Sequence, residues 1–182
     1  VPQMLKWLAE DLKTANENRD RWPWIVFLNH RPLYCSHLLD SDCNDNSNKY
    51  SQVETLLYEN SVDLYLSGHV HSYERTLPIY RNEVAQFDTR TLDTRYEQIV
   101  NPQAPIHILE GIGGRSKDGE LPKYGPLDFS VVVDFDLGYG VLNCHNRTHL
   151  EYIHYRSVDN KLVDKMVIVK DRVTYSHDLI EQ

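Results

Sequence analysis

Two histidines, His69 and His71, stand one residue apart directly after an apolar segment, VDLYLS at residues 62–67. A third histidine, His30, follows a second apolar segment, WIVFL at residues 24–28. Neutral imidazole is a ligand for zinc and iron, and ligands in α/β folds gather beyond the carboxyl ends of strands. The sequence therefore predicts a metal site built from two strand ends. The alternative is that these are loop histidines hydrogen-bonded to the backbone.

The elements that must position these histidines lie on either side of them. The two apolar segments are short and continuous, which is typical of strands buried on both faces. Between them, Val53, Leu56 and Leu57 predict a helix, so the three elements form a strand–helix–strand crossover of an α/β fold. Before them, an amphipathic helix is expected over residues 4–18, with apolar positions at Met4, Leu5, Trp7, Leu8 and Leu12.

The second half of the chain predicts a sheet with one exposed face. Strands are expected at residues 106–109, 130–135, 140–143, 149–155 and 165–169, several of which alternate apolar and polar residues. His107 lies in the first of them, where it either approaches the site or is a core histidine. No repeat or linker divides the chain, so residues 1–182 are expected to form one domain or the larger part of one.

The strings around the histidines resemble a known family. NHRPLYCS at residues 29–36 and VDLYLSGHVHSYERT at residues 62–76 are similar to sequences of the purple acid phosphatases, which belong to the calcineurin-like metallophosphoesterase superfamily. The resemblance continues through residues 104–108, 136–140 and 146–150, so it covers nearly the whole chain. It corresponds only to the carboxyl-terminal part of the family's catalytic domain, and it implies a layered αββα sandwich.

The resemblance implies a hydrolase that cleaves phosphate monoesters at a dinuclear metal centre of Fe(III) with Fe(II), Zn(II) or Mn(II). His30 and His69 would bind the divalent metal and His71 the ferric ion. A metal-bound hydroxide would attack the phosphorus at acid pH. His37 is the nearest candidate for contacting phosphate or protonating the leaving group, although it matches no motif cleanly. Three further residues are expected to orient the ligands: Tyr73, Glu74 and Arg75.

The family's upstream ligands, two aspartates, a tyrosine and an asparagine, do not appear in order before His30. We therefore expect an amino-terminal portion, in the same protein or in a separate chain, to supply them and to pair with an open edge of the sheet. Two alternatives share the fold: a non-catalytic structural or binding module, and a phosphodiesterase or nucleotide hydrolase. The retained histidines favour the phosphatase.

Composition limits the partners and the compartment. Lys and Arg number 19 against 27 Asp and Glu, for a net charge of −8, which argues against a nucleic-acid surface. No apolar run approaches the roughly 20 residues of a membrane span. A disulfide between Cys35 and Cys43 would contribute about 2.5 kcal/mol, although both could be thiols. With the Asn146 glycosylation sequon, these cysteines favour a secreted or lumenal (lysosomal or endomembrane) protein. Cys144 is left over, and a homodimer is left open.

Overall fold

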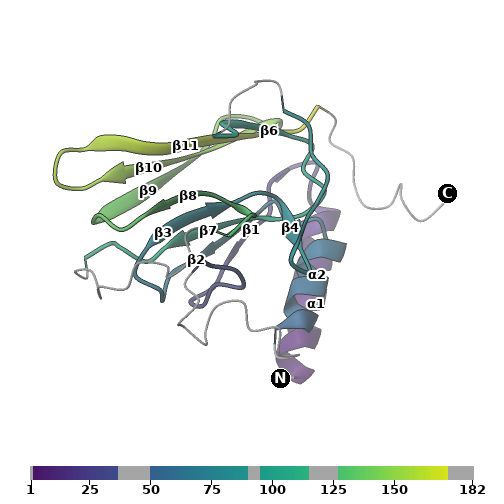
Figure 1. The fold of residues 1–182 in the computed structure, drawn as a ribbon. Helices are drawn as coiled ribbons and strands as arrows, with labels where there is room; N and C mark the ends of the chain where they lie inside the picture. Colours follow the sequence, from purple (N-terminus) through teal and green to yellow (C-terminus); the bar gives the residue numbers. More distant parts are fainter. Residues whose placement is uncertain (1, 37–49, 90–94, 115–126, 172–182) are drawn as a thin grey trace.

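The computed structural model describes residues 2–36, 50–89, 95–114 and 127–171. Figure 1 shows two stacked sheets with two helices beside the lower one. The helices are α1 (Pro2–Glu17) and α2 (Ser51–Glu59). The order of layers is thus helix, sheet, sheet, which confirms the expected α/β sandwich and supplies three layers of the αββα arrangement.

The first sheet carries the predicted crossover. Among the described residues its strand order is β1 (Val26–Leu28), β2 (Leu64–Ser67), β7 (Ile106–Glu110), β3 (Tyr73–Thr76) and β8 (Ser130–Asp134). The first three strands are parallel, and α2 connects the first two, as predicted. Their carboxyl ends therefore meet at one edge, which is the edge expected to hold the histidines.

The second sheet is stacked on the first and is mostly antiparallel. Within the described ranges its order is β6 (Gln98–Val100), β11 (Lys161–Val169), β10 (His149–Arg156) and β9 (Gly138–Cys144). A small hairpin, β4 (Ile79–Tyr80) and β5 (Glu83–Val84), lies apart from both sheets in the pairing pattern. The last three predicted strands of the chain are thus confirmed, and each extends beyond its expected bounds.

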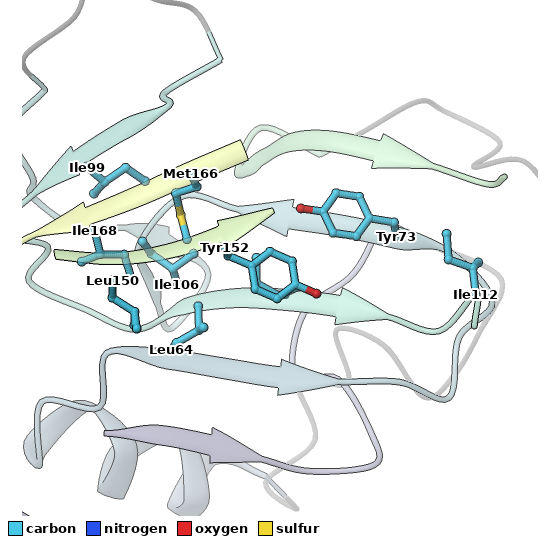
Figure 2. Packing of buried hydrophobic residues seen from close by; sticks show 10 residues of the cluster. Leu64, Tyr73, Ile99, Ile106, Ile112, Leu150, Tyr152, Met166 and Ile168 are labelled. Atoms are coloured by element: carbon cyan, nitrogen blue, oxygen red, sulfur yellow. The ribbon is translucent and has the colours of Figure 1, made fainter. Parts of the chain in front are cut away.

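Two apolar layers hold these elements together. Between the sheets, Leu64 and Ile106 pack with Leu150 and Met166, and Figure 2 shows these side chains in the space between the strands. Between the helices and the first sheet lies a second cluster: Leu8, Leu12, Ile25, Val53, Leu57, Val62 and Tyr65. Burial of such side chains is the dominant favourable contribution to folding. The first sheet is therefore fixed on both faces, and its carboxyl edge is held by a packed scaffold.

Two expectations about burial are wrong. The apolar segment at residues 24–28 is not buried on both faces: among the described strands β1 lies at the end of its sheet and pairs only with β2, and it leaves Leu28 73% exposed. On α1, Leu8 and Leu12 are buried and Leu5 packs beside them, whereas Met4 is 51% and Trp7 61% exposed, because these two lie off the helix face that packs against the sheet. Neither helix of the described residues combines the length and apolar character needed to cross a membrane.

Candidate metal centre

His30 and His69 meet at the carboxyl ends of β1 and β2. The backbone N–H of Asn29 donates to the Leu66 carbonyl at 3.0 Å, and the Gly68 N–H donates to the His30 carbonyl at 3.1 Å. These bonds continue the parallel pairing past the strand ends and hold the two loops together. The ring nitrogens His30 Nε2 and His69 Nδ1 then lie 3.0 Å apart, with the ring planes at 73°. The predicted convergence of these two histidines is confirmed.

The turn that carries His69 is strained. His69 has a φ of 72°, in the left-handed region that L-residues with a Cβ avoid. The Val70 N–H donates to the Gly68 carbonyl and the Ser72 N–H donates to the Val70 carbonyl, both at 2.9 Å, so the backbone of this loop is tightly folded. Strained conformations of this kind persist where the surrounding structure imposes them, often at functional sites.

A second loop packs against this turn. The Gly111 N–H donates to the Ser72 carbonyl at 3.0 Å, and a Cβ on Gly111 would lie 1.7 Å from the Val70 carbonyl oxygen. Only glycine therefore allows the end of β7 to approach the histidine loop so closely. Gly111 therefore supports the histidine loop from the end of β7.

His30 lines an open pocket. Its volume is about 400 Å³, and it is lined by Leu28, Asn29, His30, Leu66 and Ser67. The pocket therefore lies where β1 and β2 end, next to the exposed side chain of Leu28. It gives a small ligand direct access to His30.

The donor set fits a divalent transition metal. Two imidazole nitrogens that bind one such ion at about 2.0–2.1 Å lie roughly 3 Å apart when they occupy adjacent coordination positions. His30 and His69 match that spacing. His71 is half-buried two residues beyond. Across the described ranges, no group of three or more His, Cys, Asp or Glu side chains gathers closely enough to hold an ion. The structure thus assembles one histidine pair, and the role of His71 stays a prediction.

The residues expected to orient the ligands form the buried strand β3. Arg75 is fully buried and donates from Nε and Nη2 to the two oxygens of Asp164, at 2.6 and 2.9 Å. Tyr73 donates its hydroxyl to the same carboxylate at 2.6 Å. The Arg75 guanidinium holds the pKa of Asp164 below its usual range, although burial opposes this. These contacts tie the first sheet to the second, and a role toward the metal ligands remains a prediction.

Glu74 faces the other side of β3. Its carboxylate accepts hydrogen bonds from the Ser36 backbone N–H at 2.8 Å, the Ser36 hydroxyl at 2.7 Å and the Ser130 hydroxyl. Ser36 ends the NHRPLYCS string, so Glu74 anchors the far end of the loop that begins at His30. Through this contact Glu74 can influence the path of that loop.

His107 does not reach the site. It is buried in β7 between the rings of Tyr34 and Tyr65, each with its centroid 4.9 Å away. Its Nδ1 has no hydrogen-bond partner among the described residues. Burial lowers the pKa of His107 to about 3, so the imidazole is neutral throughout the physiological range. Of the two alternatives, the core histidine is correct.

The remaining candidates fall at other places. His37 and Cys43 lie outside the described residues, while Cys35 is fully buried. Cys144 is an exposed free thiol. Asn146 is exposed on the turn between β9 and β10, where its Oδ1 accepts hydrogen bonds from the Thr148 N–H and hydroxyl at 2.8 and 2.9 Å. The sequon is therefore accessible, and the disulfide and glycosylation stay predictions.

One contact beside the paired histidines was not predicted from the sequence. The Tyr65 hydroxyl donates to the Arg31 carbonyl at 2.6 Å and accepts from Asn29 Nδ2 at 2.9 Å. Burial raises the pKa of Tyr65 to about 12, which keeps the phenol neutral and able to donate. The sequence offers one signal for this contact: Tyr65 is a residue with a hydroxyl in the otherwise apolar segment at residues 62–67.

The sequence is similar to known phosphoesterases over most of the chain. Residues 1–73 match the sequence model of the calcineurin-like phosphoesterases, and residues 104–165 match that of the iron/zinc purple acid phosphatase-like protein C family. Acid phosphatase type 7 of Danio rerio is 40% identical over 184 residues, covering 92% of this chain and 40% of that protein. The Homo sapiens acid phosphatase type 7 is 35% identical over 182 residues, covering 93% of this chain and 40% of the relative.

A solved structure supports the same assignment. The purple acid phosphatase from yellow lupin (Lupinus luteus) seeds superposes with a TM-score of 0.78 at 26% identity, over 97% of this chain and 29% of that one. The chain therefore spans well under half the length of the relatives it matches. Since the sequence matches, the superposition and the paired histidines agree, the chain belongs to the purple acid phosphatases of the calcineurin-like metallophosphoesterase superfamily.

Proposed function

We propose that this chain is the carboxyl-terminal part of the catalytic domain of an acid phosphatase that hydrolyses phosphate monoesters at a dinuclear metal centre. The observation that carries the proposal is the 3.0 Å approach of His30 Nε2 and His69 Nδ1 at the carboxyl ends of adjacent parallel strands. Family membership supplies the reaction class, and the histidine pair supplies two of the ligands that the reaction needs.

In this proposal His30 and His69 hold the divalent ion, Fe(II), Zn(II) or Mn(II), and His71 holds Fe(III). Two such ions would polarise the phosphoryl oxygens and lower the pKa of a bound water. The chain's own contribution is to fix the imidazoles. The backbone bonds from Asn29 and Gly68 set their separation, and the pocket beside Leu28 admits the substrate.

The remaining ligands would come from an amino-terminal portion that is joined to this chain or associated with it. Two features of the described residues support this. Only two imidazoles come together, whereas two metal ions need further ligands, including carboxylates. In addition, β1 is an edge strand with Leu28 exposed, and an unpaired edge of this kind can accept another strand. Activity is therefore expected only when that portion is present.

The compartment and the modifications belong to the same proposal. A secreted or lumenal protein is supported by the accessible Asn146 sequon and by the pair of cysteines in one segment, Cys35 and Cys43. Intact mass measured before and after reduction and enzymatic deglycosylation tests both modifications. Unchanged masses would contradict this part of the proposal without touching the metal centre.

The function is tested by hydrolysis of p-nitrophenyl phosphate and of bis-p-nitrophenyl phosphate by the protein that includes the amino-terminal portion. A preference for the monoester supports a phosphatase, and a preference for the diester supports the phosphodiesterase alternative. His30→Ala and His69→Ala are each expected to lower kcat/KM at least about 100-fold and to reduce bound metal. The control is His145→Ala, since His145 is bonded to Glu151 on the hairpin between β9 and β10. Full activity in His69→Ala would refute the metal role.

A further inference from the structure

We infer that Tyr65 is a positioning residue for His30, acting with Asn29 as a clamp on the two residues that flank this histidine, through the Asn29 side chain and the Arg31 carbonyl. The inference rests on the proposed metal role of His30. Tyr65 itself touches neither substrate nor metal in this scheme. It acts by fixing the backbone from which the imidazole projects.

The Tyr65 hydroxyl contacts the residues on both sides of His30. It donates to the Arg31 carbonyl at 2.6 Å and accepts a hydrogen bond from Asn29 Nδ2 at 2.9 Å. Asn29 Nδ2 also lies 3.3 Å from the Arg31 carbonyl, which closes a small polar ring around His30. Displacement of the Asn29 side chain or of the Arg31 carbonyl would break one of these bonds, so the hydroxyl restricts the path of the chain on both sides of His30.

The clamp is attached to a rigid base. Tyr65 is fully buried in β2, and its ring stacks on Phe27 of β1 with centroids 5.4 Å apart and planes at 29°. The Tyr65 ring also packs against the ring of His107 in β7, with the ring centroids 4.9 Å apart. The hydroxyl is thus held by three adjacent parallel strands, and its position cannot drift with the loop.

His30 needs such support because it is exposed, as is Asn29, at the rim of the open pocket. Side chains at a surface are not fixed by close packing in the way that core side chains are. Metal affinity depends on groups behind the ligands that set their orientation, and removal of such groups typically costs 10–100-fold in affinity. A hydroxyl that fixes the loop is therefore expected to matter for affinity as well as for stability.

The experiment is a Zn²⁺ titration of the metal-free protein, read by competition with a chromophoric chelator, for the wild type and for Tyr65→Phe, His30→Ala and the double variant. Tyr65→Phe removes only the hydroxyl and is expected to raise the Kd for Zn²⁺ about tenfold. In the double variant the loss is expected to equal that of His30→Ala alone, because the clamp acts only through His30. If Tyr65 had a purely structural role, the double variant would lose more Zn²⁺ affinity than His30→Ala alone.

The matched control is Tyr152→Phe, which also removes a buried hydroxyl, donated at 2.7 Å to Glu110, on the opposite sheet. Both phenylalanine variants are expected to lose similar stability in urea, but only Tyr65→Phe should lose Zn²⁺ affinity. If Tyr65→Phe unfolds, Asn29→Ala removes the other half of the clamp from an exposed position and is expected to weaken binding in the same direction.

Each outcome decides one proposal. His30-dependent Zn²⁺ binding that weakens in Tyr65→Phe supports the clamp. The clamp is overturned if Zn²⁺ binding depends on His30 but the Kd for Zn²⁺ is the same in Tyr65→Phe as in the wild type. Where Asn29→Ala replaces Tyr65→Phe, an unchanged Kd has the same meaning. Either result leaves the phosphatase proposal intact. Zn²⁺ binding that is unaffected by His30→Ala overturns the proposed function and, with it, the clamp.

Discussion

Replacement of His107 by phenylalanine is expected to remove much of the acid sensitivity of this fold. His107 is buried between Tyr34 and Tyr65, with its Nδ1 unpaired among the described residues. Burial lowers its pKa from 6.5 to about 3. Between these values the unfolded chain binds a proton at this residue and the native protein does not, so stability falls as the pH falls.

The size of the effect follows from this difference in pKa. Above about pH 7.5 both states are neutral at His107 and the residue contributes nothing to the pH dependence. Below pH 6.5 the free energy of unfolding should fall by about 1.4 kcal/mol per pH unit until the native pKa is approached. At pH 5 the accumulated loss is therefore about 2 kcal/mol. This is a large share of the 5–15 kcal/mol that typically stabilises a domain.

The assay is urea unfolding of the wild type and of His107→Phe at pH 7.5, 6.0 and 5.0. The difference in free energy between the two proteins should move by about 2 kcal/mol in favour of the variant between pH 7.5 and 5.0. The wild-type His107 ring signals, followed by NMR, should not titrate over this range. A constant difference between the proteins, or a His107 titration with a midpoint near 6.5, would refute the reasoning.

Three further predictions concern stability and can be checked by the same unfolding assay. At φ 72°, His69→Gly should be about 1 kcal/mol more stable than His69→Ala, because only glycine is free of strain there; the reverse order would contradict that strain. Asp164→Asn should cost about 3–5 kcal/mol, since it leaves the buried Arg75 guanidinium without its carboxylate; a loss below 1 kcal/mol would show that the pair is solvated. Gly140→Ala should cost about 1–3 kcal/mol, because its Cβ would lie 1.8 Å from a buried tyrosine hydroxyl, whereas Gly113→Ala, with nothing within 4 Å, should be neutral.

The meeting of His30 and His69 could be predicted from the sequence for a simple reason. Each histidine follows a short apolar strand, the two strands are joined by one helix, and a right-handed crossover places such strands parallel and often adjacent. Their carboxyl ends must then lie at the same edge. The spacing of β1, α2 and β2 along the chain was enough to assign this edge, and the pairing of Val26 with Leu64 confirms it.

The strand β3 could not be predicted in the same way. Its sequence is YERT, and two charged residues in four argue against a strand that is buried along its whole length. Burial is possible because Asp164 neutralises Arg75 and two serines bond Glu74, all from distant parts of the sequence. Hydrophobic periodicity depends only on residues that are close in sequence. A strand that is buried because of partners far along the chain therefore shows no such pattern.

His107 illustrates the same limit at a single residue. The sequence places His107 in a strand at residues 106–109, and this position left both roles open, a residue of the site or a core histidine. What excludes it from the site is the direction of its side chain in β7, toward Tyr34 and Tyr65. Alternation along a strand sends successive side chains to opposite faces, and one apolar run does not reveal which face is which.

Three departures from local preference lie near one another at one edge of the first sheet. His69 is held at positive φ, Gly111 makes a contact that any side chain would block, and Leu28 is exposed beside an open pocket. Each departure lowers stability or solubility and none contributes to the cores between the layers. All three lie at the carboxyl ends of β1, β2 and β7, beside the two facing imidazoles, which is where the metal site is proposed.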